Sequence, residues 1–193
     1  MAKDNIEIEI KIPVSKKVFA DVKRVLDKEA KFISATKEID KYFNPPHRSF
    51  LETKHPYEYL RLRLKKNQGV LTYKYIHFNQ KGQKTHANEY ESTLGKPIQL
   101  EKILTVLDFK NFLTIEKLRE KYVYQHQFEI VLDKVKNLGY FIEIEALKNL
   151  GGVKLAQKKL KVFAQKIGLD PTKKDNLGYI LLMMKKKGLW TPD

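Results

Sequence analysis

Charged side chains recur at every second position in several short segments of the chain. Acids occur in the pairs Glu7/Glu9, Glu89/Glu91 and Glu143/Glu145, and bases in the pairs Arg61/Arg63 and Lys117/Arg119. Carboxylates are preferred ligands of Mg²⁺ and Mn²⁺, while Arg and Lys bind phosphate oxygens. A metal ion with basic side chains is the usual means of neutralising a polyphosphate during phosphoryl transfer. Solvent-facing sides of ordinary half-buried strands give the same alternation, so the residues alone leave both interpretations open.

The segments that carry these charges have the period-two pattern typical of β-strands. In the first of them, isoleucines alternate with Glu7, Glu9 and Lys11, and we expect Pro13 to end the strand. The expected strands are Ile6–Ile12, Phe32–Phe43, Tyr57–Lys65, Val70–Phe78, Ala87–Thr93, Phe112–Gln125, Phe128–Val135 and Tyr140–Ala146. Many short strands joined by hairpins indicate a sandwich or a closed barrel.

Helical spacing of apolar residues appears between and after these strands. The expected helices are Val18–Leu26 with Ser15 as its cap, a short helix that begins at Pro97, Val153–Ile167 with Gly168 as its stop, and Asn176–Lys187. Long linkers and internal repeats are absent from the sequence. We therefore predict one α+β domain over residues 1–193, with strands from about 5 to 146 and C-terminal helices from about 153 to 187.

The composition excludes several classes of protein. The chain has 193 residues, with 38 Lys and Arg against 23 Asp and Glu, which gives a formal net charge of +15. This surplus favours anionic partners without choosing among them. Cysteine is absent, which excludes disulfides, thiol nucleophiles and cysteine-ligated metals. Because the chain has neither the apolar core of a signal peptide nor an apolar run of about 20 residues, we expect a soluble cytoplasmic protein without a membrane partner.

The charged segments resemble, in order along the chain, the motifs of the CYTH superfamily, also called triphosphate tunnel metalloenzymes. The matching segments are Glu7–Lys11 for ExExK, Asp40–Phe43 for D-x-Y-F, Leu60–Arg63 for L-R-x-R, Thr72–Lys74, Glu89–Glu91, Lys117–Tyr122 for K-x-R-x-x-Y, Leu132–Val135 and Leu138–Glu145. The resemblance covers most of residues 5–187. The motif residues are most similar to those of the class IV adenylyl cyclase branch, although Ser49 and Gly178 differ from that branch's usual residues.

The resemblance implies an eight-stranded antiparallel β-barrel with flanking helices and a triphosphate bound in its lumen. It makes seven acids metal-ligand candidates for Mg²⁺ or Mn²⁺, namely Glu7, Glu9, Glu145, Glu143, Asp133, Glu89 and Glu91. It implies phosphate contacts by Lys11, Arg61, Arg63, Lys74, Lys117 and Arg119. Tyr42 is a candidate for positioning the substrate, and a purely structural role for its hydroxyl stays open.

The function that the resemblance implies is metal-dependent chemistry on a small-molecule triphosphate. A class IV adenylyl cyclase reaction, which converts ATP into cyclic AMP and pyrophosphate, is the first candidate. The alternative is a triphosphatase that hydrolyses inorganic tripolyphosphate, thiamine triphosphate or a nucleoside triphosphate, because one lumen can serve both reactions. A basic module that only binds nucleic acid or polyphosphate is a third possibility, although acid-rich strands repel phosphate unless they carry a metal ion. Exposed barrel walls are compatible with a homodimer.

Overall fold

The computed structural model describes residues 6–53, 56–66, 68–80, 82–148 and 150–190. The predicted start of the first strand near residue 5 and the last three residues of the predicted domain lie outside these ranges. The described residues form two compact units. The first unit contains residues 6–7 and 37–116, and the second contains residues 8–36 and 117–190. We describe each unit by itself.

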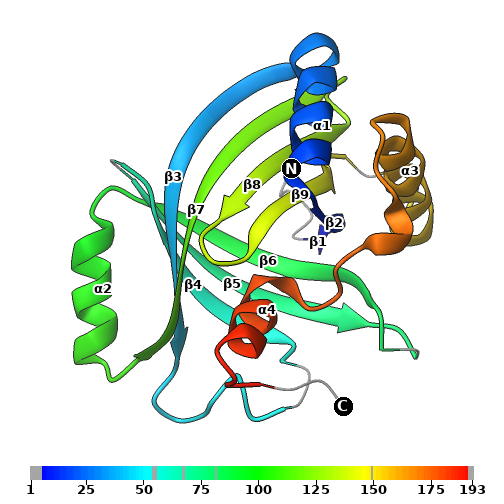
Figure 1. The fold of residues 1–193 in the computed structure, drawn as a ribbon. Helices are drawn as coiled ribbons and strands as arrows, with labels where there is room; N and C mark the ends of the chain where they lie inside the picture. Colours follow the sequence, from blue (N-terminus) through cyan, green and yellow to red (C-terminus); the bar gives the residue numbers. More distant parts are fainter. Residues whose placement is uncertain (1–5, 54–55, 67, 81, 149, 191–193) are drawn as a thin grey trace. The chain divides into compact units, whose positions relative to one another are not determined.

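The first unit is built on antiparallel strands with one covering helix (Figure 1). Its strands are β1 (Ile6–Glu7), the later part of β3 (Lys31–Asn44), β4 (Glu58–Leu64), β5 (Gly69–Phe78), β6 (Lys84–Leu94) and the first part of β7 (Lys110–Tyr124). They lie in the order β1-β6-β5-β4-β3-β7. Helix α2 (Pro97–Val106) places Leu104 against Phe43 and Leu62, which forms the apolar core of this unit.

The second unit contains the larger apolar core. Its sheet has the order β7-β8-β9-β2, with β8 spanning Phe128–Val135, β9 Gly139–Ala146 and β2 Glu9–Val14. Its helical elements are α1 (Lys16–Glu29), α3 (Val153–Lys166), the 3₁₀ turn η1 (Pro171–Lys173) and α4 (Gly178–Lys186). Leu26 of α1 and Leu160 of α3 are fully buried with the isoleucines of β2 and β9.

The predicted fold class is confirmed as α+β with antiparallel strands and flanking helices, but the described part of the chain contains nine strands rather than eight. The difference arises in the predicted strand Ile6–Ile12. It is interrupted at Ile8, so that β1 pairs with β6 and β2 pairs with β9. The expectation that Pro13 ends this strand is wrong, because β2 continues to Val14. Proline is tolerated there because β2 is the last strand in the order, where a missing N–H breaks no ladder.

Ser15, Pro97 and Gly168, which the sequence predicts to begin or end helices, do so in the structure. The Ser15 hydroxyl accepts a hydrogen bond from Val18 N at 3.3 Å and caps α1, and Pro97 opens α2. Gly168 follows α3 with a φ of +86°, a conformation that favours glycine. Among the described residues, no helix has the length and apolar character needed to cross a membrane. The single domain and the homodimer stay predictions.

Truncating the core of the second unit tests this packing. We expect Leu160→Ala to lower the free energy of unfolding by about 2–5 kcal/mol, because it leaves a cavity among buried side chains. Val162→Ala on the same helix is the matched control, since Val162 is 59% exposed, and its effect should stay within about 0.5 kcal/mol. Urea unfolding followed by circular dichroism measures both. Equal losses in the two variants would contradict the placement of α3.

Candidate functional site

One face of the sheet in the first unit carries its predicted charged residues, and we call it the first charged face. Directly opposed residues of neighbouring strands point to the same side of a sheet. The rows on this face are Tyr42–Arg61–Thr72–Glu91, Asp40–Arg63 and Tyr59–Lys74–Glu89. The opposite face carries Leu60, Leu62 and Leu64, which pack toward α2. The alternation in β4 therefore separates a charged face from an apolar one.

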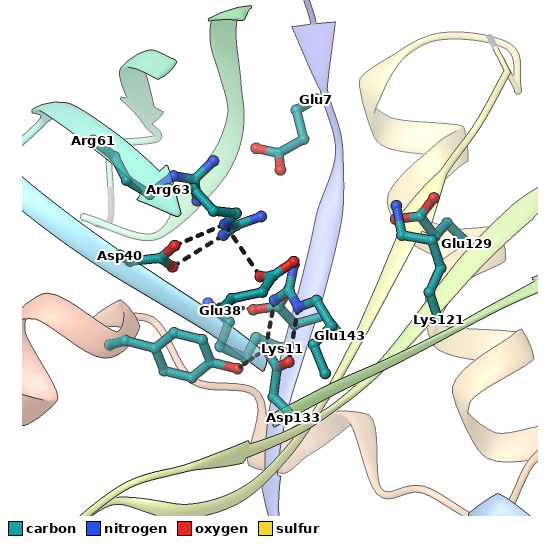
Figure 2. A network of polar contacts seen from close by, with 12 residues as sticks. Glu7, Lys11, Glu38, Asp40, Arg61, Arg63, Lys121, Glu129, Asp133 and Glu143 are labelled. Atoms are coloured by element: carbon teal, nitrogen blue, oxygen red, sulfur yellow. Dashed lines mark hydrogen bonds and ion pairs between the residues drawn. The ribbon is translucent and has the colours of Figure 1, made fainter. Parts of the chain in front are cut away.

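Arg63 is held by two buried acids on this face. Its Nε lies 2.7 Å from Oδ1 of Asp40, and its second terminal nitrogen lies 3.0 Å from Oδ2, so the pair is bidentate. The same Nε lies 3.2 Å from the Glu38 carboxylate (Figure 2). Asp40 and Glu38 are at most 1% exposed. Since bidentate pairs fix a guanidinium in one orientation, the position of Arg63 is set by its acids.

Arg61 and Lys74 form a second network on the same face. One Arg61 terminal nitrogen donates to Thr72 Oγ1 at 3.0 Å and to Glu89 and Glu91 at 3.3 Å each. Lys74 lies 3.2 Å from Glu89 and also pairs with Glu7 of β1. Burial by itself lowers the pKa of Arg61, but the neighbouring carboxylates raise it overall, so the side chain stays a cation.

One face of the sheet in the second unit carries the remaining predicted residues, and we call it the second charged face. The rows on this face are Glu9–Glu145–Glu129, Lys11–Glu143–Val131–Lys121 and Arg119–Asp133–Phe141. Lys117 precedes Arg119 by two residues on β7 and shares its side of the strand. The opposite face, with residues such as Ile10 and Ile144, belongs to the core under α1 and α3.

Glu143 bridges two cations on the second charged face. Its carboxylate lies 2.8 Å from Lys11 Nζ and 2.9 Å from an Arg119 terminal nitrogen (Figure 2). Asp133 is fully buried and holds Arg119 through contacts of 2.8 and 2.5 Å. The hydroxyl of Tyr179 donates to the same Asp133 carboxylate at 2.8 Å. Lys11 and Arg119 are thus each matched by at least one acid.

These contacts shift the ionisation of the pair at the centre of the network. Burial by itself raises the pKa of Glu143, but the charges of Lys11 and Arg119 outweigh it, and the pKa lies well below the usual glutamate range. Burial by itself lowers the pKa of Lys11, but Glu143 and Glu9 raise it above the usual lysine range. Both groups are therefore charged at neutral pH.

A row of carboxylates on the second charged face fits a divalent cation by its chemistry. Glu9 lies directly opposite Glu145, which lies opposite Glu129. Like charges directly opposed destabilise a sheet, and a cation between them removes the repulsion. Within the described ranges, no three His, Asp or Glu side chains already converge as a metal site. Mg²⁺ commonly binds through one or two carboxylates, with water and substrate phosphates completing its shell, so Glu9 and Glu145 suit it.

Five of the seven predicted metal ligands contact a Lys or Arg, and Glu9 lies close enough to Lys11 to raise its pKa. Glu7, Glu89 and Glu91 pair with Lys74 or Arg61, and Glu143 and Asp133 pair with Arg119. Tyr42 is buried and lies opposite Arg61, with its ring 6.3 Å from that of Phe112. Their roles as ligands and in positioning the substrate stay predictions.

Several residues of these networks were given no role by the charge pattern of the sequence. They are Glu38, Asp40, Thr72, Glu129 and Tyr179. Glu38 and Asp40 carried a usable signal, because they are acids two apart on one strand, like the assigned pairs. The charge pattern gave no such signal for Tyr179, because this residue lies in the apolar first part of helix α4, far along the chain from the charged strands.

Comparison with known proteins supports a family relationship over most of the chain. The chain matches the family model of the CYTH domain over residues 5–179. It is similar to the solved structure of the PH1819 protein from Pyrococcus horikoshii, with 30% identity and a TM-score of 0.79. That alignment covers 93% of this chain and 99% of the other. No match was found among curated proteins.

Two more distant structures share the fold. An adenylate cyclase candidate from Vibrio parahaemolyticus is 16% identical, with a TM-score of 0.73 over 94% of this chain and 99% of the other. An adenylyl cyclase candidate from Hippeastrum, described with a dominant triphosphatase activity, is 16% identical, with a TM-score of 0.65 over 97% of each chain. At this level of identity the likeness concerns the fold alone.

Removing the Glu143 charge tests the network of the second charged face. Glu143→Gln leaves Lys11 and Arg119 without their shared acid, and we expect a loss of about 3–5 kcal/mol in unfolding free energy at pH 7. Because the folded-state pKa of Glu143 is lowered, its contribution is present above about pH 4.3 and is lost as the pH falls further. The difference in unfolding free energy between the wild type and Glu143→Gln should therefore become smaller below that pH.

Urea unfolding at pH 7, 5, 4 and 3 measures this gap. Glu29→Gln is the matched control, because Glu29 forms a half-exposed pair with Lys166 at 3.2 Å, which contributes at most about 1 kcal/mol. A pH-independent gap for Glu143→Gln would contradict the charge network.

Proposed function

Because the chain belongs to the CYTH domain family, we propose that it is a metal-dependent enzyme that acts on a triphosphate. The observation that carries the proposal is that cations on the two charged faces are buried and held in place by acids. Lys11, Arg61, Arg63 and Arg119 are largely buried, and each is fixed by carboxylates. Cations held in place before the substrate arrives stabilise developing phosphate charge without reorganisation.

Arg61 supplies a specific reason to expect an oxyanion on the first charged face. Its Nε is buried and has no hydrogen-bond acceptor among the described residues, although its terminal nitrogen has three. A buried donor without an acceptor is costly and usually has a partner in the functional state. A phosphate oxygen would accept this hydrogen bond and gain a charge-assisted contact.

The first candidate reaction is that of a class IV adenylyl cyclase. The ribose 3′-oxygen of ATP attacks the α-phosphorus, and the bond from that phosphorus to the pyrophosphate oxygen breaks. Lys and Arg side chains neutralise the charge that moves onto the departing pyrophosphate. Mg²⁺ or Mn²⁺ held by Glu9 and Glu145 would polarise the attacked phosphate and stabilise the leaving group.

The second candidate is a triphosphatase, in which water attacks the terminal phosphorus and orthophosphate is released. Two observations favour keeping it. Ser49 and Gly178 differ from the residues usual in the cyclase branch. The similar Hippeastrum protein is described with a dominant triphosphatase activity. The two reactions differ in which phosphorus lies beside the metal ion and whether a hydroxyl or a water is in line.

Product analysis distinguishes the candidates. The purified chain is incubated with Mg²⁺ or Mn²⁺ and, separately, with ATP, thiamine triphosphate and tripolyphosphate, and the products are resolved. We expect cyclic AMP with equimolar pyrophosphate from ATP. Orthophosphate without cyclic nucleotide would assign the triphosphatase instead. Absence of turnover on every substrate, with salt-dependent oligonucleotide binding, would contradict an enzyme and favour a binding module.

Glu9→Gln tests the carboxylate row. The substitution preserves size and removes one charge, and we expect turnover to fall about 10²–10³-fold, as for loss of one electrostatic contact to a transition state. Raising the Mn²⁺ concentration should partly restore the rate, because a weakened metal site is filled by mass action. Glu29→Gln, with the same chemical change on α1, should keep wild-type turnover. Wild-type activity in Glu9→Gln would remove Glu9 from the site.

A further inference from the structure

Tyr179 joins helix α4 to the second charged face through four contacts. Its hydroxyl donates to Asp133 Oδ2 at 2.8 Å. The centre of its ring lies 3.9 Å from Lys11 Nζ and 5.5 Å from Lys117 Nζ. Its other neighbour is Phe141, whose ring lies 4.9 Å away in an edge-on arrangement. Tyr179 is only 5% exposed, so these contacts are made away from water.

The start of α4 is tied to the strand that carries Lys11. The backbone N–H of Asp175 donates to the Lys11 carbonyl at 2.7 Å. The Asp175 carboxylate accepts from Leu177 N at 3.0 Å and from Gly178 N at 2.7 Å, and so satisfies free amides at the helix start. Because Tyr179 directly follows Gly178, this connection sets the ring beside Lys11.

An aromatic ring close to two ammonium groups changes the energy of both. Lys11 and Lys117 repel each other, and a buried cation is attracted to the face of an aromatic ring by about 2 kcal/mol. At the same time the hydroxyl adds a donor to Asp133, a carboxylate that already holds Arg119 twice. One side chain thus acts on three cations of the same face.

We propose that Tyr179 is a positioning residue whose ring holds Lys11 and Lys117, so that both cations meet the phosphates of the substrate. This inference rests on the proposed function. The hydroxyl contact to Asp133 helps to anchor the ring, and burial and the charges of Glu143 and Asp133 raise the pKa of Tyr179 well above its usual value. It therefore stays a neutral donor throughout the physiological pH range.

A merely structural tyrosine and a positioning tyrosine differ in what a substitution changes. If Tyr179 only fills space, its replacement lowers stability and leaves the affinity of the folded protein for phosphates unchanged. If it positions the lysines, the affinity falls when the ring is removed and is retained when only the hydroxyl is removed. Affinity for a triphosphate, measured well below the unfolding temperature, separates the two roles.

The experiment measures binding of inorganic tripolyphosphate by calorimetry, with Mg²⁺ present and, separately, without metal. We expect Tyr179→Leu to weaken binding about 5- to 30-fold, the equivalent of about 1–2 kcal/mol, and Tyr179→Phe to stay within about 3-fold of wild type. If the leucine variant does not fold, Tyr179→Met replaces it, because methionine fills irregular cores. Met183→Ala, which truncates a buried residue of the same helix, is the control and should lower only the melting temperature.

The outcomes separate the inference from the proposed function. Wild-type affinity in Tyr179→Leu, or equal weakening in Met183→Ala, overturns the positioning role while tripolyphosphate binding by the wild type still supports the proposed function. A wild-type protein that binds tripolyphosphate neither with nor without Mg²⁺ overturns the proposed function and the inference with it. Weakening confined to the variants without a ring supports the inference.

Discussion

Burying a cation is costly unless an acid lies close to it, and this constraint governs both charged faces. On the second face Glu143 lies between Lys11 and Arg119, and Asp133 holds Arg119 from the other side. On the first face Asp40 and Glu38 do the same for Arg63. The acids that make burial tolerable also restrict the geometry of the cations. Basic side chains that are ordered in advance suit phosphate chemistry, because their ordering is part of folding.

Rigid support for these networks comes from the opposite sides of the same strands. In the second unit, isoleucines of β2 and β9 pack under α1 and α3, and in the first unit, leucines of β4 pack toward α2. A charged side chain on a strand is therefore one residue away from a core side chain. Slipping a strand by one residue would exchange the two faces, which is why the apolar cores also specify the register of the charges.

The acids of the motif pairs do different work. Glu143 and Asp133 contact Lys11 and Arg119 directly, and Glu9, which also acts on Lys11, lies opposite Glu145 across β2 and β9. Members of one motif, such as Glu143 and Glu145, therefore have different neighbours although both point to the same face. This division follows from which residue lies across the sheet, and it underlies our choice of Glu9 and Glu145 as metal ligands.

The sequence by itself determined the charged faces, the helix signals and the strands other than the first, because strand alternation, Ser15, Pro97 and Gly168 act locally. The CYTH motifs likewise follow from the order of residues along the chain. The division of the first strand at Ile8 arose only in the structure. Only the tertiary structure decided which charges pair, since Arg63 meets Asp40 across neighbouring strands and Tyr179 reaches Asp133 from a helix far along the chain. Such contacts depend on register and on helix docking, which arise from packing of the whole unit rather than from local residue pattern.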